Sequence, residues 1–424
     1  MKKVLQKLLV ITSIGFLCSC SSKNVAQDDC LTSIQILDRN GFKETISTKD
    51  RLALYEKTNF SHVQPYEKVI RVYSKDQEGK TPSKINTYHE NGQLWQYLEV
   101  VNGRASGSYR EWHSNGKLRL DVMVMEGMAD LSEEAQTNWV FDGLSRVWDE
   151  QGNILAEIHY DKGLIQGNAL YYHPSGKIHR IVPYEKGRID GELLLYDDNG
   201  QVVGKSTYQM GKKEGLLFFK GDQTIPPYSE WYLHDLIINA SYHDLSGKIV
   251  AEIKDGEGKK AFFANGLLES LHEYQNGLPE GKVVLFDEKG GIKNSFYVKD
   301  GLKHGEEWIY YPTSTPKLQL NWYEDEIHGI CRSYYTDGTL ESEREIYGNK
   351  KHGVSSAWYH DGSLMLIEEY ENDELREGIY MKKGTPEPVS RVEKGEGIVT
   401  LYDGNGQFLK RIPLQKGRPI VHIE

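Results

Sequence analysis

Cysteine is scarce in this sequence: four occur among 424 residues, and two of them, Cys18 and Cys20, fall in the N-terminal segment. The other two, Cys30 and Cys331, leave room for one bridge at most, so a disulfide framework and a paired-cysteine metal site are excluded. The motifs of familiar active sites are missing as well. There is no Gly-x-x-x-x-Gly-Lys-Ser/Thr loop and no nucleophile elbow. We therefore expect no catalytic residue, no cofactor and no metal.

Positive charge is also in short supply. Lysine and arginine number 51 against 62 aspartates and glutamates, which gives a net charge of −11. Nucleic-acid binding needs a basic surface, so nucleic acid is excluded as a partner. Apolar residues reach only 38%, whereas glycine (42) and tyrosine (27) are abundant. This composition favours short strands joined by tight turns over one compact core.

Long apolar runs are absent except near the N-terminus. There, three lysines precede a ten-residue apolar stretch at 8–17. At a rise of about 1.5 Å per residue this stretch is too short to span a bilayer, so it is typical of an export signal. The next residues, Leu17-Cys18-Ser19-Cys20, resemble the lipobox of bacterial lipoproteins. The resemblance implies cleavage before Cys20 and acyl chains, such as palmitate, attached at Cys20.

The resemblance also implies a location in the cell envelope. Ser21, rather than aspartate, follows the lipidated cysteine, which by the sorting rules of Gram-negative bacteria favours the outer membrane in such an organism. Removal of residues 1–19 takes away three lysines and no acidic residue, so the net charge of −11 becomes −14. Anionic lipid repels such a chain. We therefore expect the membrane to hold the protein through lipidated Cys20.

Glycine is distributed periodically. Turn glycines that close Tyr/Trp-x-x-(Asn/Asp)-Gly segments lie 24 residues apart wherever the repeats are uninterrupted: Gly92, Gly116, Gly152, Gly176, Gly200, Gly266, Gly290, Gly338, Gly362 and Gly406. Ser314 stands where the period would place another glycine. A second glycine lies eleven residues after the first, and a third lies nine residues before the next turn. The long arms suit strands, and the four-residue link suits a turn.

Side chains follow the same period. Five positions after each third glycine stands an aromatic residue, and this aromatic column is the predicted interaction surface: Trp112, Trp148, Tyr172, Tyr196, Phe286, Tyr310, Tyr334, Trp358 and Tyr402. Apolar residues stand two and eight positions after the turn glycine, and even offsets share one face of a strand. We predict an all-β fold, an elongated twisted antiparallel sheet of stacked 24-residue β-hairpins with loop insertions. A small N-terminal segment has mixed structure.

The repeat resembles a known family. The run from Tyr274 to Gly290, YQNGLPEGKVVLFDEKG, is similar to the MORN repeat, and more closely to its bacterial variant in proteins labelled as YwqK-type antitoxins. The resemblance extends over roughly residues 85 to 417 with interruptions. It implies repeats that occur near membranes and at protein contacts. His304, His328 and His352 occupy the place before the third glycine where the family often has histidine.

The predicted organisation has six segments. In chain order they are a signal peptide (1–19), a tether (20–29), an N-terminal capping segment (30–85), repeats (86–219), an irregular insertion with a degenerate repeat (220–264), and repeats with a C-terminal cap (265–424). Within the capping segment we expect a hairpin at Asn40-Gly41 and a short helix near 48–57. Further insertions lie at 128–140 and 379–396.

Two residue patterns invite chemistry, and geometry argues against both. Equivalent residues of successive repeats are two strands apart, about 9–10 Å. Zinc ligands lie about 2.0–2.3 Å from the ion, so the histidine column cannot share one. The His-Asp neighbours at 234–235, 243–244 and 360–361 should point to opposite faces of a strand, which disfavours a catalytic relay.

Three functions fit the sequence. The first is a membrane-anchored envelope lipoprotein whose repeats form a non-catalytic scaffold for an unknown protein partner. The alternative is a glycan or lipid-headgroup binding module that uses the aromatic columns as stacking platforms. The second alternative is an antitoxin-like neutralising protein, although an exported chain is badly placed to meet a cytoplasmic toxin.

Overall fold

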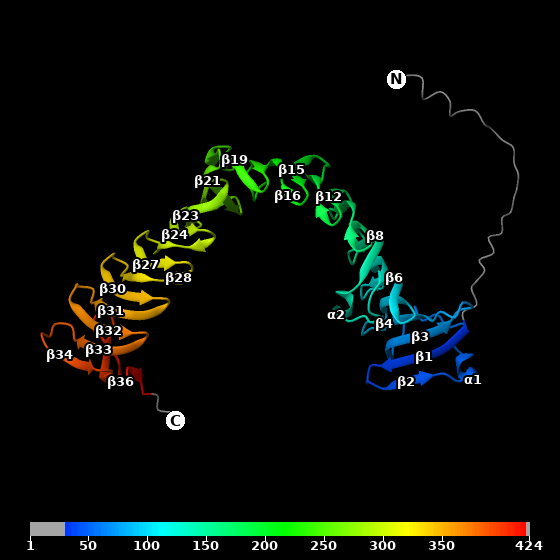
Figure 1. Ribbon diagram of the computed structural model, residues 1–424, viewed down its shortest axis with the longest axis horizontal. Coiled ribbons are helices and arrows are strands. Elements are labelled where there is room, and N and C mark those ends of the chain that lie inside the picture. Colours follow the sequence, from blue (N-terminus) through cyan, green and yellow to red (C-terminus); the bar gives the residue numbers. More distant parts are fainter. Residues whose placement is uncertain (1–29, 421–424) are drawn as a thin grey trace, which may run out of the picture. The chain divides into compact units, whose positions relative to one another are not determined.

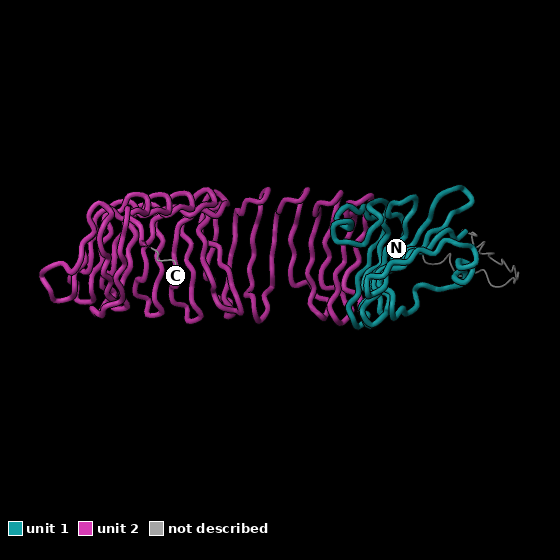
Figure 2. The backbone as a smooth tube through the Cα atoms, turned by 90° about the horizontal axis from the view of Figure 1, so that it is seen from below, with its two compact units in different colours: residues 1–152 teal, residues 153–424 magenta. Residues whose placement is uncertain are grey.

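The computed structural model describes residues 30–420. The predicted signal peptide, the tether and the lipidation site Cys20 lie outside the described residues. The chain divides into two compact units, residues 1–152 and 153–424, drawn in teal and magenta in Figure 2. In both units the described residues are mostly strands, and the two helices have four residues each. The predicted all-β class is confirmed.

The described part of unit 1 contains eight strands and two helices (Figure 1). In chain order they are β1 (Cys30–Asp38), β2 (Lys43–Ile46), α1 (Lys49–Leu52), β3 (Glu67–Lys75), β4 (Pro82–Tyr88), β5 (Leu94–Val101), β6 (Arg104–Trp112), β7 (Leu118–Glu126), α2 (Glu133–Gln136) and β8 (Val140–Trp148).

The described part of unit 2 contains strands alone. They are β9 (Ile154–Asp161), β10 (Leu164–Ile165), β11 (Gly167–Tyr172), β12 (Ile178–Glu185), β13 (Arg188–Ile189), β14 (Gly191–Tyr196), β15 (Val202–Gln209), β16 (Lys212–Lys213), β17 (Gly215–Phe219), β18 (Tyr228–Leu233), β19 (Leu236–His243), β20 (Ile249–Lys254), β21 (Glu257–Ala264), β22 (Leu267–Gln275), β23 (Leu278–Phe286), β24 (Ile292–Lys299), β25 (Leu302–Lys303), β26 (Gly305–Tyr310), β27 (Pro316–Tyr323), β28 (Glu326–Ile327), β29 (Gly329–Tyr334), β30 (Leu340–Tyr347), β31 (Lys350–Trp358), β32 (Leu364–Glu371), β33 (Glu374–Met381), β34 (Pro388–Glu393), β35 (Glu396–Tyr402), β36 (Phe408–Gln415) and β37 (Arg418–Pro419).

Neighbouring strands are antiparallel and follow chain order. In unit 1, β1 lies between β2 and β3, and the sheet continues through β4, β5, β6 and β7 to β8. In unit 2 the longer strands likewise pair in chain order, as β9 with β11 and β11 with β12, and two-residue strands such as β10 and β13 close the hairpins. Antiparallel neighbours need only tight turns. The predicted sheet of stacked hairpins is confirmed within each unit.

The first turn of each repeat requires a residue in the left-handed region. Gly176 has a φ of +80°, and its N–H donates to the carbonyl of His173 at 2.9 Å. Glycine adopts this φ without steric cost. The turn shifts the pairing, so that Tyr172 lies opposite Ile178 next to a β-bulge. Ser314, at the position where the period predicts a glycine, has a φ of +65°.

The structure differs from one prediction at the second turn of each repeat. The four-residue link between the second and third glycines does not form a turn, because its first two residues, Arg188–Ile189, form β13. The chain instead reverses at Lys186-Gly187, where φ is +50° and +78°. Two consecutive positive φ values are typical of a type I′ turn, which fits the twist of a hairpin. The hairpin therefore reverses just before the predicted link.

The two faces of the unit 1 sheet carry separate cores. On one face Trp112 of β6 packs in the cluster that contains Leu52 of α1. On the other face Tyr109 of the same strand packs against Trp139 from the insertion at 128–140. Side chains alternate along a strand, so residues three apart reach opposite faces. The capping segment and the insertion thus each complete one core.

The structure differs from a second prediction at residues 220–264. This segment is regular rather than irregular, because β18 to β21 pair in order through it. Pro226 and Pro227 lie between β17 and β18, where a missing N–H breaks no ladder. The segment also carries a core of its own, with Ile237, Tyr242 and Ile253 nearly inaccessible to solvent.

Candidate functional site

The predicted aromatic column lies where each hairpin arm meets its first turn. Eight of its nine members pair across a bulge with the residue two positions after the turn position, as Tyr172 does with Ile178 and Trp358 with Leu364. All nine are half-buried. Their rings therefore help to pack the ends of the hairpins, and a role for the column in binding stays a prediction.

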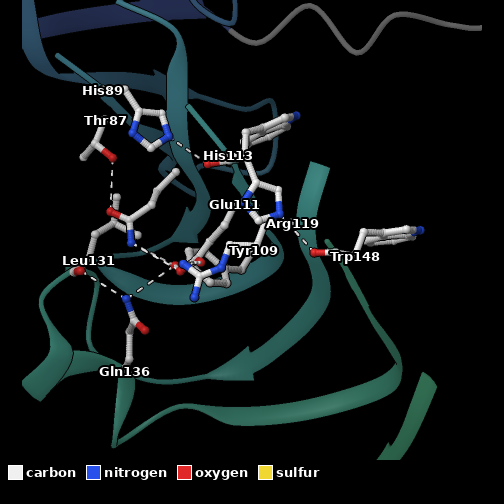
Figure 3. Close-up of polar contacts among 11 residues, drawn as sticks. Thr87, His89, Tyr109, Glu111, His113, Arg119, Leu131, Gln136 and Trp148 are labelled. Atoms are coloured by element: carbon white, nitrogen blue, oxygen red, sulfur yellow. Dashed lines mark hydrogen bonds and ion pairs between the residues drawn. The ribbon is translucent and has the colours of Figure 1, made fainter. Parts of the chain in front are cut away.

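The residue that directly follows a member of the aromatic column can hydrogen-bond to the next repeat, a role that sequence reasoning missed. The ring Nε2 atoms of His89, His113 and His173 donate to the carbonyl of the next aromatic residue at 2.8, 3.0 and 2.9 Å; Figure 3 shows the first two. The phenols of Tyr311 and Tyr335 donate in the same way at 2.9 and 2.7 Å, whereas that of Tyr359 donates to the carbonyl of Met381 at 2.7 Å. A histidine or tyrosine directly after the aromatic residue was the feature of the sequence that could have predicted these hydrogen bonds.

The His-Asp neighbours bind different partners. His234 approaches Glu214 through Nδ1 at 3.6 Å, whereas Asp235 accepts a hydrogen bond from the backbone N–H of Lys213. Asp244 and Asp361 each accept backbone N–H groups of their own turns. These aspartates therefore hold turns in place, and none of them orients the adjacent imidazole.

Four glutamates are nearly buried, although sequence periodicity alone would place such residues in solvent: Glu111, Glu230, Glu307 and Glu368. Figure 3 shows how the first is held. Glu111 accepts the hydroxyl of Tyr109 and, at 3.0 Å, Nη1 of Arg119. The amide of Gln96 donates to the same phenol oxygen at 3.0 Å. Burial and the adjacent carboxylate raise the pKa of Tyr109, which keeps its hydroxyl a donor.

Glu230 is held by three donors from β18, β19 and β21. The hydroxyls of Tyr232 and Tyr242 donate at 2.8 and 2.6 Å, and Nζ of Lys260 lies at 2.7 Å. Desolvation raises the pKa of Glu230, but the attraction of Lys260 and the three hydrogen bonds outweigh it and leave the pKa lowered. The carboxylate is therefore charged inside the core, where it depends on its cation.

We expect His272, beside this network, to make unit 2 less stable in acid. Burial lowers the pKa of His272, and the charge of Lys260 lowers it further. The unfolded chain has the ordinary value of about 6.5 and binds more protons below it, so stability falls as the pH drops from that value toward the folded pKa. In His272→Gln this loss should shrink. Thermal unfolding between about pH 7.5 and pH 5 measures it, with the exposed His62→Gln as control. An unchanged pH dependence in His272→Gln would contradict the assignment.

Glu307 repeats the pattern with an indole in place of a phenol. It accepts Nε1 of Trp322 at 2.7 Å, the amide of Asn294 at 2.8 Å and Nζ of Lys303 at 3.0 Å. The same ammonium lies 4.6 Å from the centroid of the Trp322 ring, within the range of a cation–π contact. Both oxygens of this carboxylate are thus occupied by the protein itself.

Glu368 differs because it borders a cavity. The hydroxyls of Tyr370 and Tyr380 donate to it at 3.0 and 2.8 Å. The cavity, of about 500 Å³, is also lined by Arg344 and Lys351, and by the apolar side chains of the last hairpins. Nζ of Lys351 lies 4.3 Å from the centroid of the Tyr370 ring.

The predicted histidine column belongs to a longer ladder of rings. His304, Tyr323, His328, Tyr347 and His352 follow one another with ring centroids 4.5–6.2 Å apart. We call these five residues the rim ladder. A tyrosine separates each histidine from the next. Among residues 30–420, no three His, Cys, Asp or Glu side chains are grouped as a metal site requires.

The two tyrosines of the rim ladder depart from the repeat pattern. They stand nine positions after the turn position, where the other matching hairpins of unit 2 carry polar residues: Asp161, Glu185, Gln209, Gln275, Lys299, Glu371 and Gln415. Tyr323 is 54% exposed and Tyr347 is 63% exposed. An aromatic residue in an otherwise polar column was the signal that sequence reasoning overlooked.

The described cysteines are unpaired. Cys30 is exposed and Cys331 is buried, and the bridge between them that the sequence left open is not formed. Burial raises the pKa of the Cys331 thiol, so little reactive thiolate is present at neutral pH. No helix within residues 30–420 is long and apolar enough to cross a membrane.

Comparison with known families matches the MORN repeat variant at four segments, 141–162, 165–186, 189–210 and 327–347. The chain therefore carries MORN repeats, as the resemblance implied. No curated protein matches it. Among solved structures, a porin-like protein from Bacteroides uniformis shares 10% identity over 66% of this chain and 93% of its own length. The TM-score of 0.15 is too low to support an argument.

Proposed function

We propose that this chain is an envelope lipoprotein, anchored through acyl chains on Cys20, whose MORN repeats form a non-catalytic scaffold for a protein partner. The lipobox-like Leu17-Cys18-Ser19-Cys20 supports the anchor. Repeat sheets offer extended surfaces to partners. Three of the four buried carboxylates are enclosed in networks within the protein, which favours a structural role for them.

The rim ladder is the observation on which the partner proposal depends. Three successive hairpins place five rings in a row, and the two tyrosines are more than half exposed. Large aromatic side chains are enriched at protein interfaces, where they bury apolar area at little entropic cost. Their presence in a column that is otherwise polar indicates a function other than packing.

The charge of the chain defines the partner further. After removal of residues 1–19 the net charge of −11 becomes −14 because three lysines are lost. Opposite charge steers association and suppresses wrong partners. The proposed partner is therefore an envelope protein with a basic surface around an apolar patch, and its association with the scaffold should weaken at high salt.

Replacement of both ladder tyrosines should remove the partner. In Tyr323→Ser/Tyr347→Ser we expect the recovery of envelope proteins by proximity labelling in living cells to fall about tenfold or more, because truncated aromatic anchors cost about 2 kcal/mol each. Trp231→Ser is the matched control, since Trp231 is 50% exposed in a different part of unit 2. Equal recovery by the double variant, or no reproducible envelope protein with the wild type, would refute the proposal.

A further inference from the structure

Unit 1 contains a cavity of about 1130 Å³ between its sheet and the segment 49–61. Strands β1, β3, β4, β5 and β6 supply one side, and the segment supplies the other. The carbonyl of Phe60 accepts the hydroxyl of Tyr88 at 2.6 Å and the amide of Asn86 at 3.1 Å, so the segment is fastened to the sheet. Leu52 is buried in the neighbouring core. The cavity is thus a built feature of the capping segment.

The side chain of Asn86 lies in the wall of this cavity. Asn86 is 3% exposed, and its Oδ1 has no hydrogen bond. The carbonyl of Phe60 fixes the orientation of the amide, because it can only accept and therefore faces Nδ2. Buried polar atoms in native proteins almost always have partners. Oδ1 is an exception, because it is enclosed by protein atoms and lies out of reach of a ligand in the cavity.

Aromatic rings line both sides of the cavity. Tyr97 and Trp112 come from the sheet, and Tyr55 and Phe60 from the segment, with their rings stacked at 6.2 Å and 15°. Asn86 lies directly opposite Tyr97 in the strand register, so the acceptor and a ring are adjacent. A pyranose presents an apolar C–H face that packs on such rings and hydroxyl groups at its edge. An acyl chain would satisfy the rings but leave the charged side chains of the lining without a partner.

The lining of the cavity is basic, whereas the chain as a whole is acidic. Four basic residues border the cavity, Lys49, Lys57, Lys84 and Arg110, against the two acids Asp50 and Glu56. Arg110 is paired with Asp121 at 3.0 Å. Within residues 30–420, the three lysines form no ion pair. Lys84 is two residues from Asn86 on β4 and therefore shares its face.

We propose that this cavity binds an acidic oligosaccharide. A sugar ring stacks on Trp112 and Tyr97, and uronate carboxylates pair with Lys57 and Lys84. The site is in unit 1 and shares no residue with the rim ladder, so it goes beyond the partner proposed above. Failure of either proposal leaves the other intact.

The test is an array of uronate-containing and neutral oligosaccharides of matched length, followed by calorimetry with the tightest binder. The wild type should bind the acidic members. Lys57→Ala/Lys84→Ala should bind about tenfold more weakly, because a charge-assisted contact to each carboxylate is lost. Lys68→Ala, an exposed lysine of β3 outside the cavity, is the matched control and should be unchanged.

Both lysines of the double variant are exposed, so its fold should be intact, which melting against the wild type verifies. Selective acidic binding that falls in Lys57→Ala/Lys84→Ala but not in Lys68→Ala supports the proposal. Binding to no saccharide at millimolar concentration, equal binding to neutral and acidic members, or equal losses in the double variant and the control would each overturn it.

Discussion

Cys20→Ala is expected to move the protein from the membrane fraction to the soluble fraction. The proposed anchor consists of acyl chains on that one cysteine, and each buried methylene contributes about 0.8 kcal/mol, so two or three chains hold firmly where one holds weakly. The rest of the chain is acidic, and anionic headgroups repel it. Without the acyl chains no attraction of comparable size should remain.

Fractionation after metabolic labelling with an alkyne fatty acid measures this result. Wild-type protein should carry the label and sediment with membranes, and Cys20→Ala should carry none. Cys18→Ala is the matched control, because it alters the same segment two residues earlier and leaves Cys20, the proposed site of acylation, in place. Label or membrane association that persists in Cys20→Ala would show that the lipobox resemblance misleads.

Lys260→Met should destabilise the hairpins around Glu230 by about 3 kcal/mol, because it removes the cation that pairs directly with a buried carboxylate. The ammonium lies 2.7 Å from Glu230, and the two side chains are 17% and 3% exposed. The hydroxyls of Tyr232 and Tyr242 would still donate, but neither brings a charge. The loss should therefore be large and local.

Hydrogen exchange of the backbone amides in β18 to β21 measures the local free energy of opening. The adjacent Lys259→Met is the control: its ammonium is 3.6 Å from Glu273 and 53% exposed, and such surface pairs contribute about 0–1 kcal/mol. Glu230→Gln combined with Lys260→Met should recover much of the loss, since the neutral amide still accepts from a phenol. Equal effects of the two lysine variants would refute a special role for Lys260.

Much of the fold follows from the glycine period, because a turn that needs positive φ restricts its residues. Gly176 and Ser314 occupy such turns at the predicted spacing. The second turn was misplaced because Lys186 also adopts positive φ, and lysine carries no sequence mark of that conformation. Residues 220–264 were predicted to be irregular because Pro226-Pro227 looked like an interruption, whereas the prolines lie between strands.

The candidate sites were harder to predict, since they depend on contacts between repeats. The period identified His328 but not the Tyr347 that stacks on it at 4.5 Å. Burial of Glu307 could not be foreseen, because glutamate usually faces solvent and only the fold brings Trp322 and Lys303 to it. The cavity of unit 1 depends on how the segment 49–61 lies against strands far from it in sequence.

The last described hairpin of unit 2 has a consequence for self-assembly. A sheet whose every hairpin resembles the next could extend indefinitely by adding another molecule at its end. Here β37 is two residues long, Pro419 has no N–H to offer, and Pro413 of β36 also lacks one. Among the described strands, β37 is thus a poor template for another chain, since both prolines interrupt the row of N–H donors that pairing requires.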